Sequence, residues 1–281
     1  MPQRYLIEEK LREFLKEDLG QGDITSQTLI PEDQKAYAKL FYREEGIVAG
    51  LEETRILYNI LGCTVAQHAQ DGDLTKPEIT LLEVSGSARS ILEGERLALN
   101  MIGRMAGIAT ITAQLIKKTG NKIKVAATRK TAPGLRYFDK KAVALGGGDT
   151  HRFRLDDCVL IKDNHLALLS SITEAVKRAR ENVSFTKKIE VEVRSFEEAV
   201  EAAEAGADII MFDNMSPAQI KENLKSLSEK GLREGIIYEA SGGVTPENVA
   251  GYSESGVDVV SLGYLTHSVR ALDVKLEIEM T

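Results

Sequence analysis

The segment from residue 123 to residue 262 alternates between short β-rich runs and amphipathic stretches, and this alternation constrains the possible folds more than any other feature. The expected strands are 123–128, 158–161, 189–193, 208–212, 236–240 and 257–262. Strands and helices that alternate in this way predict parallel strands joined by right-handed crossovers. The pattern is therefore typical of either a doubly wound open sheet or an α/β barrel.

The residues at the end of each expected strand favour the barrel. Polar residues or glycines follow the strands in turn: Arg129 and Lys130, Lys162, Glu192, Asp213, Ser241 with Gly242 and Gly243, and Gly263. A barrel surrounds one site with all of its strand ends, whereas an open sheet uses mainly the ends beside its switch point. We therefore expect one site that is shared by all six strand ends.

The run IEVEV indicates how one strand is oriented. Ile189, Val191 and Val193 share one face of this strand, and Glu190 and Glu192 share the other. In a barrel, the apolar face contacts the surrounding helices and the carboxylates face a charged interior. The alternative is an edge strand with one solvated face.

The N-terminal third is expected to form an antiparallel α+β layer. Its expected elements are a helix over 51–61 and strands over 37–43, 64–70 and 79–84. Ser90 followed by Glu93 is a capping-box pattern, and the apolar stripe behind it predicts one long helix that ends near Gly120. This helix is the expected link between two domains.

Cationic side chains gather in one part of an otherwise acidic protein. Between Arg129 and Lys162 there are eight lysines and arginines but four aspartates, whereas the whole chain carries a net charge of −7. Guanidiniums, ammoniums and the exposed N–H groups of Gly146-Gly147-Gly148 suit a small anion that carries phosphates or carboxylates. The alternative is a solvated basic loop.

Composition excludes several classes of protein. The net acidity argues against a general nucleic-acid binder. The N-terminal run MPQRYLIEEKLREFLKEDL has a charge every few residues, so it predicts neither a signal peptide nor a membrane span, and we expect a cytoplasmic location. Cys63 and Cys158 lack metal-ligand spacing, and we expect free thiols rather than a disulfide or a metal site.

Eight segments in a fixed order carry a family resemblance. They are GERLALN (94–100), TRKTAPGLR (128–136), KKAVALGGGDTHR (140–152), LIKDNH (160–165), EVEV (190–193), AGADIIMFDN (205–214), EASGGVT (239–245) and GVDVVSLGYLTHS (256–268). The chain resembles the quinolinate phosphoribosyltransferases. The N-terminal segments EDLGQGDITS (17–26) and REEGIVAG (43–50) resemble the same family, so the likeness covers nearly the whole chain.

The resemblance implies both a fold and a reaction. The implied domains are an N-terminal α/β sandwich (1–108), a C-terminal incomplete α/β barrel of six or seven parallel strands (109–268) and a final segment (269–281) that returns to the first domain. The implied reaction converts quinolinate and phosphoribosyl pyrophosphate, with Mg²⁺, into nicotinate mononucleotide, pyrophosphate and carbon dioxide in NAD biosynthesis. The implied assembly is a homodimer or a dimer-based hexamer.

The resemblance also implies which residues bind substrate. They are Arg96, Arg129, Lys130, His151, Arg152, Lys162, Glu192, Asp213, Ser241, Gly242, Gly243 and Gly263. The implied catalytic members of this set are Lys130, Lys162, Glu192 and Asp213. In the family, the arginine that corresponds to Arg96 reaches into the partner subunit's site.

Physical chemistry makes these roles intelligible. Quinolinate is a planar dicarboxylate, which the forked guanidiniums of Arg129, Arg152 and Arg96 suit. Phosphates need cations at several points, and the family's positions for these are Lys130, His151 and Lys162. The carboxylates of Glu192 and Asp213 would hold ribose hydroxyls and the Mg²⁺ shell, and Ser241, Gly242, Gly243 and Gly263 would offer N–H groups to the 5′-phosphate.

Other positions are expected to lie outside the chemistry. His165 and His267 are expected to be packed or capping residues, and Lys141 and Arg154 to be solvated or structurally paired. Lys140 matches a family position less strictly than Lys130 does. Many family members have asparagine where this chain has Thr150 and serine where it has Ala106, and both positions are expected to neighbour contacting residues.

Three other functions remain open from the sequence. One is a nicotinate phosphoribosyltransferase or a molybdenum-uptake-associated relative on the same fold. Another is a Schiff-base aldolase, because Lys162 ends a barrel strand. The third is a non-catalytic nucleotide-binding or regulatory module.

Overall fold

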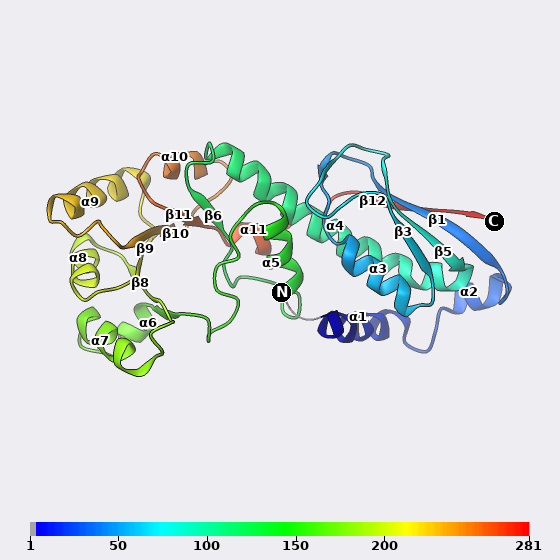
Figure 1. Cartoon of the computed structure of the whole chain (residues 1–281), viewed down its shortest axis with the longest axis horizontal. Helices are drawn as coiled ribbons and strands as arrows, with labels where there is room; N and C mark the ends of the chain where they lie inside the picture. Colours follow the sequence, from blue (N-terminus) through cyan, green and yellow to red (C-terminus); the bar gives the residue numbers. More distant parts are fainter. Residues whose placement is uncertain (1–3, 281) are drawn as a thin grey trace. The chain divides into compact units, whose positions relative to one another are not determined.

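The computed structural model describes residues 4–280 and forms two compact units (Figure 1). Unit 1 contains the described residues up to Ile111, residues 144–146 and the described residues from Val269 onward. Unit 2 contains residues 112–143 and 147–268. Helix α4 (Ala88–Lys118) contributes residues to both units, and the boundary expected after residue 108 falls within this helix.

Unit 1 contains an antiparallel sheet with the strand order β12-β1-β5-β3. These strands are β1 (Lys35–Tyr42), β3 (Thr64–Gln67), β5 (Thr80–Ser87) and β12 (Val274–Met280), and the short strands β2 (Gly46–Ile47) and β4 (Leu74–Thr75) pair separately. Its other helices are α1 (Arg4–Leu19), α2 (Ile24–Leu29) and α3 (Leu51–Ile60). The expected antiparallel α+β layer is confirmed.

The core of unit 1 joins its sheet to two helices. Leu40 on β1 and Leu82 on β5 are buried in one cluster with Leu51 of α3 and Ile102 of α4. Ala106 belongs to the same cluster and is fully buried. The alanine at this position therefore contributes to packing inside unit 1.

The start of helix α4 differs from the sequence expectation, whereas the C-terminal segment joins unit 1 as expected. Helix α4 begins at Ala88, so the predicted start at Ser90 is wrong. The amide of Ala88 donates to the carbonyl of Gln34 at 2.9 Å, and this contact serves the helix start in place of a Ser90 cap. Within the C-terminal segment 269–281, strand β12 pairs antiparallel with β1.

Unit 2 contains the six expected parallel strands, in the order β6-β11-β10-β9-β8-β7. They are β6 (Lys124–Ala126), β7 (Val159–Ile161), β8 (Ile189–Val193), β9 (Ile209–Asp213), β10 (Ile237–Ser241) and β11 (Val259–Ser261). Strands β6 and β7 are the two edges, and a parallel bridge joins Ala126 to Asp149 beyond β6. The sheet is therefore an incomplete α/β barrel, as expected.

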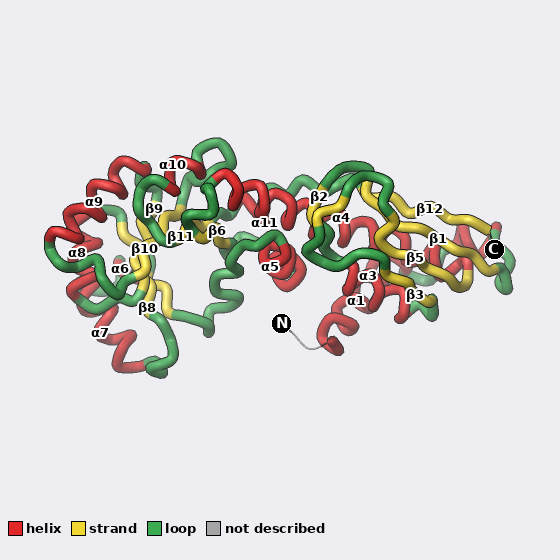
Figure 2. The backbone as a smooth tube through the Cα atoms, turned by 45° about the horizontal axis from the view of Figure 1, so that its top comes forward, coloured by secondary structure: helices red, strands yellow, loops and turns green. Residues whose placement is uncertain are grey.

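Helices follow most of the strands of unit 2. They are α5 (Arg136–Leu145), α6 (Asp163–Leu166), α7 (Ile172–Asn182), α8 (Phe196–Glu204), α9 (Pro217–Glu229), α10 (Val249–Ser253) and α11 (Tyr264–His267). Figure 2 shows the sheet curved, with α7 to α10 on its outer side. All five residues of β8 are buried, because this strand lies between β7 and β9. The alternative of an edge strand with a solvated face is therefore wrong.

Candidate active site

A pocket of about 600 Å³ lies at the C-terminal ends of the barrel strands. Its walls contain all but one of the predicted binding residues: Arg129, Lys130, His151, Arg152, Lys162, Glu192, Asp213, Ser241, Gly242, Gly243 and Gly263. The exception is Arg96, which is exposed on α4 in unit 1. The structure thus brings together the residues at all six strand ends.

Capped helices begin soon after strands β8 and β9. Ser195 caps α8 by accepting from the amide of Glu198 at 3.1 Å, two residues after β8 ends. Ser216 and Gln219 form a capping box at the start of α9, which begins with proline. Because the helices begin so soon, the last strand residues and the turns form the pocket wall.

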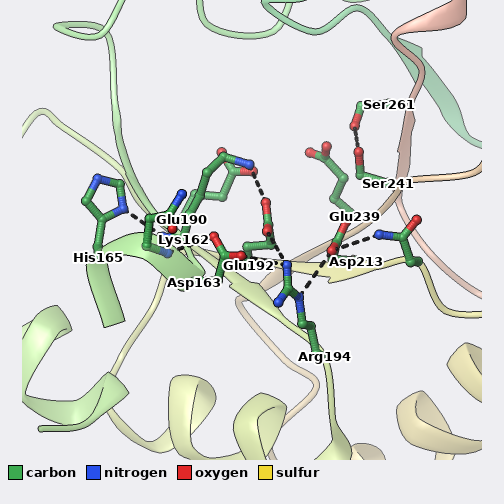
Figure 3. Close-up of polar contacts among 12 residues, drawn as sticks. Lys162, Asp163, His165, Glu190, Glu192, Arg194, Asp213, Glu239, Ser241 and Ser261 are labelled. Carbon is green, nitrogen blue, oxygen red and sulfur yellow. Dashed lines mark hydrogen bonds and ion pairs between the residues drawn. The ribbon is translucent and has the colours of Figure 1, made fainter. Parts of the chain in front are cut away.

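The acidic side of the pocket is a network of charges. Glu192 is 8% exposed and forms an ion pair with Lys162. Arg194 lies between Glu192 and Asp213 in Figure 3; its guanidinium is 4.0 Å from a Glu192 oxygen and 3.4 Å from an Asp213 oxygen. Asn214 also donates to Asp213 at 2.9 Å. One cation therefore reaches both carboxylates.

The basic side of the pocket contains an unpaired donor. Nε of Arg129 is buried and has no hydrogen-bond partner among residues 4–280. Arg152 donates from its guanidinium to the carbonyl of Cys158 at 3.4 Å. A buried guanidinium N–H without a protein acceptor favours an anionic ligand at this wall.

The third wall is built from glycines that leave no room for a side chain. Gly242 has φ +81°, and a Cβ atom there would lie 2.5 Å from Oδ1 of Asn214. A Cβ atom on Gly263 would lie 2.8 Å from the Lys130 side chain. The hydroxyl of Ser261 donates to that of Ser241 at 3.0 Å. The turns on this side of the pocket therefore require glycine.

Comparison with known proteins assigns the chain to one family. The family model of the quinolinate phosphoribosyl transferase N-terminal domain matches residues 23–106, and that of the C-terminal domain matches residues 108–277. The chain belongs to the quinolinate phosphoribosyltransferase family.

Individual relatives match this chain over most of the length of both sequences. A probable carboxylating nicotinate-nucleotide pyrophosphorylase of Methanothermobacter thermautotrophicus is 46% identical over 271 residues, which cover 95% of this chain and 97% of the relative. NadC from Streptococcus pyogenes has a TM-score of 0.93 at 36% identity, with 100% and 99% of the two chains covered. Human nicotinic acid phosphoribosyltransferase, at 12% identity and a TM-score of 0.61, shares the fold alone.

His151 has its two ring nitrogens in contact with the protein. Nε2 lies 3.3 Å from a Glu239 oxygen and 3.6 Å from a Glu190 oxygen, and Nδ1 accepts from the amide of Arg152 at 2.7 Å. Desolvation acts to lower the pKa of His151, but the two glutamates outweigh it and raise the pKa to about 10. The Arg152 amide opposes protonation of Nδ1, because it needs the lone pair there. In either state Nε2 carries a proton that faces the glutamates.

Lys140 and Lys141, on helix α5, are both buried. Lys140 is fully buried, donates to the carbonyls of Thr150 and Arg152, and does not line the pocket. Burial, followed by the charge of Arg136, lowers the pKa of Lys140 to about 8. Lys141 is also buried and interacts within the protein, which fits the expected structural pairing, whereas Arg154 is exposed, which fits the expected solvation.

The sequence analysis missed part of the family's pocket. His267 and Asn214 line it, although His267 was expected to lie outside the chemistry. The detectable signal for His267 is its spacing, because it follows Gly263 by four residues and a helical turn brings the two together. His165 fits its expected role, since Nδ1 accepts from the amide of Lys162 at 3.0 Å.

Two remaining expectations concern the rest of this family member. Cys63 and Cys158 are free thiols, as expected, and burial raises the pKa of Cys63 to about 11. Among residues 4–280, no helix combines the length and the apolar character that a membrane span requires.

Proposed function

We propose that this protein transfers the phosphoribosyl group of phosphoribosyl pyrophosphate to quinolinate, with decarboxylation, to give nicotinate mononucleotide, pyrophosphate and carbon dioxide. Three relatives at 46% identity are named probable carboxylating nicotinate-nucleotide pyrophosphorylases. The observation that carries the proposal is one pocket with guanidiniums on one wall, carboxylates on another and glycine turns on a third.

Quinolinate would bind on the basic wall. Arg129 presents a buried N–H that has no acceptor among the described residues 4–280, and Arg152 lines the same pocket. Each guanidinium offers two parallel donors, which match a carboxylate. Arg96 would complete this subsite from the partner subunit of a homodimer or a dimer-based hexamer. The two carboxylates of quinolinate together offer enough acceptor oxygens for all three guanidiniums.

Phosphoribosyl pyrophosphate would occupy the remaining walls. Lys130 and Lys162 supply charge for its phosphates, and the backbone N–H groups of Gly242, Gly243 and Gly263 suit the terminal 5′-phosphate. Ser241 adds a hydroxyl, and Glu192 and Asp213 face the ribose hydroxyls. His267 stands beside Gly263 and adds a polar group on the same wall.

The carboxylates of Glu192 and Asp213 also fit a magnesium ion. Magnesium prefers oxygen ligands and takes one or two carboxylates together with substrate phosphates. The guanidinium of Arg194 already lies within 4.0 Å of both carboxylates, so a cation between them is compatible with the pocket. When bound, the ion would supply positive charge to the oxygens of the departing pyrophosphate.

The chain's own residues would act mainly by position and charge. As the bond from C1′ to the pyrophosphate oxygen breaks, the electron pair leaves with pyrophosphate, and Lys130 and Lys162 stabilise the growing negative charge. Glu192 and Asp213 lie where the ribose ring becomes positive. The pyridine nitrogen then bonds to C1′.

Quaternisation of the ring nitrogen prepares the loss of carbon dioxide. The electron pair of the broken C2–carboxylate bond stays at C2, next to a positive nitrogen that stabilises it. A proton then binds at C2. Arg129 and Arg152 hold the ring in place through these steps.

The ion pair of Lys162 argues against the aldolase alternative. A Schiff-base lysine must act as a neutral amine that is open to substrate, whereas the Lys162 ammonium contacts the Glu192 carboxylate in an ion pair. A nicotinate-using enzyme and a non-catalytic module are separated from the proposal by product analysis. We also propose that the protein works in the cytoplasm.

The deciding experiment follows products from purified protein, phosphoribosyl pyrophosphate and Mg²⁺ with either quinolinate or nicotinate. We expect one carbon dioxide per mononucleotide from quinolinate and poor use of nicotinate, because nicotinate leaves a desolvated guanidinium without its partner. Comparable kcat/KM for nicotinate, or mononucleotide without matching carbon dioxide, would contradict the proposal. Binding without turnover would favour the non-catalytic module.

A further inference from the structure

The short segment 149–152 brings Arg152 to the pocket without regular secondary structure. His151 has φ +50°, a left-handed conformation that is unusual for a residue other than glycine. Its amide donates to Oδ1 of Asp149 at 2.7 Å, and its Nδ1 accepts from the amide of Arg152 at 2.7 Å. A strained backbone persists only where surrounding contacts determine it. The contacts of this segment therefore decide where Arg152 lies.

The carbonyl side of the same segment is held by a buried ammonium. Lys140 on α5 donates to the carbonyl of Thr150 and, at 2.7 Å, to that of Arg152. The amide of Arg152 binds the imidazole and its carbonyl binds Lys140. The backbone of this arginine is thus fixed on both sides.

Two buried carboxylates anchor the imidazole from inside the barrel. Glu190 on β8 is 0% exposed and Glu239 on β10 is 2% exposed, and both approach Nε2 of His151. The three groups have ligand-type atoms that all lie within 4.8 Å of one another. Both Glu190 oxygens and Oε1 of Glu239 have no hydrogen-bond partner among residues 4–280.

Stability does not account for this cluster. Two carboxylates removed from water carry a large desolvation cost, and the facing imidazole offers them a single N–H. What the cluster does achieve is orientation, because it fixes the ring whose other nitrogen holds Arg152. Neither Glu190 nor Glu239 lines the pocket, so any influence on substrate must pass through another residue.

We propose that Glu190 and Glu239 are positioning residues that act through His151 to hold Arg152 in place for a substrate carboxylate. The inference rests on the proposed function, since it takes quinolinate as the ligand of Arg152. It adds two residues inside the barrel to those that determine substrate recognition. The chain of contacts runs from Glu239 to the His151 ring and then to the Arg152 backbone.

The test removes the Glu239 carboxylate and determines whether the resulting loss of quinolinate binding depends on Arg152. Glu239→Met keeps the volume but removes the acceptor, whereas Glu239→Gln keeps an amide oxygen that accepts from Nε2. Quinolinate binding is measured by calorimetry without phosphoribosyl pyrophosphate. We expect Glu239→Met to weaken binding about tenfold and Glu239→Gln to retain most of it. KM for phosphoribosyl pyrophosphate should stay within about twofold.

A double-mutant cycle with Arg152→Lys decides the route of the effect. If Glu239 acts through Arg152, adding Glu239→Met to the Arg152→Lys variant should weaken quinolinate binding little further. An unchanged tenfold loss in the Arg152→Lys background would overturn the inference, as would wild-type binding by Glu239→Met. Glu53→Met, which removes a buried glutamate of unit 1, controls for lost stability and should leave quinolinate binding unchanged.

The same experiment separates this inference from the proposed function. Wild-type turnover of quinolinate is measured first, and its absence would contradict the proposed function. With wild-type turnover present, the outcome of the cycle bears on Glu239 and His151 alone. If Glu239→Met unfolds, Glu190→Met with Arg152→Lys provides the same cycle, because it also removes a carboxylate that faces Nε2 of His151, and the same loss of additivity is expected.

Discussion

Arg129 and Arg152 stand in the same wall but are held differently. Within residues 4–280, the buried Nε–H of Arg129 has no hydrogen-bond partner, whereas Arg152 has its guanidinium near the Cys158 carbonyl and its backbone fixed by Lys140 and His151. The free donor of Arg129 suits a ligand atom, and the fixed backbone of Arg152 suits precise placement. Both features indicate that a ligand carboxylate is recognised by the geometry of its hydrogen bonds as well as by its charge.

We therefore expect that Arg129→Lys and Arg152→Lys each impair the use of quinolinate although the charge is kept. An ammonium cannot form two parallel hydrogen bonds to one carboxylate, and one charged hydrogen bond contributes about 1.5–3 kcal/mol. Steady-state kinetics should show kcat/KM lower by roughly ten- to a hundredfold. Wild-type kcat/KM in both variants would remove these arginines from the substrate site.

We expect buried Lys140 to make the free energy of unfolding depend on pH. The pKa of Lys140 falls from 10.5 to about 8 in the fold, mainly through burial. Between these pH values the unfolded chain holds a proton that the folded chain has lost, so the free energy of unfolding rises with pH. Lys140→Met removes this contribution.

Urea unfolding of both proteins across this pH range measures the effect. The stability of the wild type relative to Lys140→Met should increase by about 3 kcal/mol between pH 8 and pH 10.5. A difference between the two proteins that stays constant with pH would show that Lys140 keeps an ordinary pKa in the fold.

At the scale of elements, the strand ends determine the site. Strands β8 and β9 each end in a turn that a capped helix soon follows. The ends of all six strands could be located from the sequence, because polar residues and glycines interrupt the apolar runs there. The turn after β10 has less room for a side chain than the turn after β11. A Cβ on Gly263 would lie 2.8 Å from Lys130, whereas a Cβ on Gly242 would lie 2.5 Å from Asn214. This turn depends on glycine for both its conformation and its space.

Gly242→Ala and Gly206→Ala form a matched pair that separates these two requirements. Their φ angles are +81° and +82°, but among residues 4–280, apart from the two adjacent residues, no atom lies within 4 Å of a Cβ on Gly206. Both substitutions should cost about 1 kcal/mol of stability through backbone strain. Only Gly242→Ala should also raise KM for phosphoribosyl pyrophosphate, because it must displace Asn214 or the turn. Equal kinetics in the two variants would contradict a phosphate-binding role for this turn.

Sequence and structure agree where a local pattern decides the outcome and differ where packing decides it. Alternation in IEVEV placed Glu190 and Glu192 on one face correctly, because pleat geometry is local. The start of α4 depends on a contact between Ala88 and Gln34, which are distant in sequence. The burial of Lys141 and the place of His267 in the pocket also follow from how helices pack, so composition could not indicate them.

At the scale of the whole molecule, one expected ligand residue stands apart from the others. Arg96 is exposed on α4 in unit 1, whereas the residues that line the pocket all belong to unit 2. An exposed arginine in the other unit agrees with a role toward a second copy of the chain. The basic wall of one subunit's pocket would then be complete only in the assembled protein.

Complementation between two inactive chains tests this composite site. Arg96→Ala and Lys162→Ala should each be nearly inactive, since one loses a guanidinium for the carboxylates and the other a cation for the phosphates. In a mixed dimer, one of the two sites contains both Arg96 and Lys162, so mixing should restore up to about half of the wild-type activity per heterodimer. Subunit exchange is verified with differently tagged chains, and mixtures of each variant with itself serve as controls. If verified heterodimers stay inactive, Arg96 acts within its own subunit or outside the chemistry.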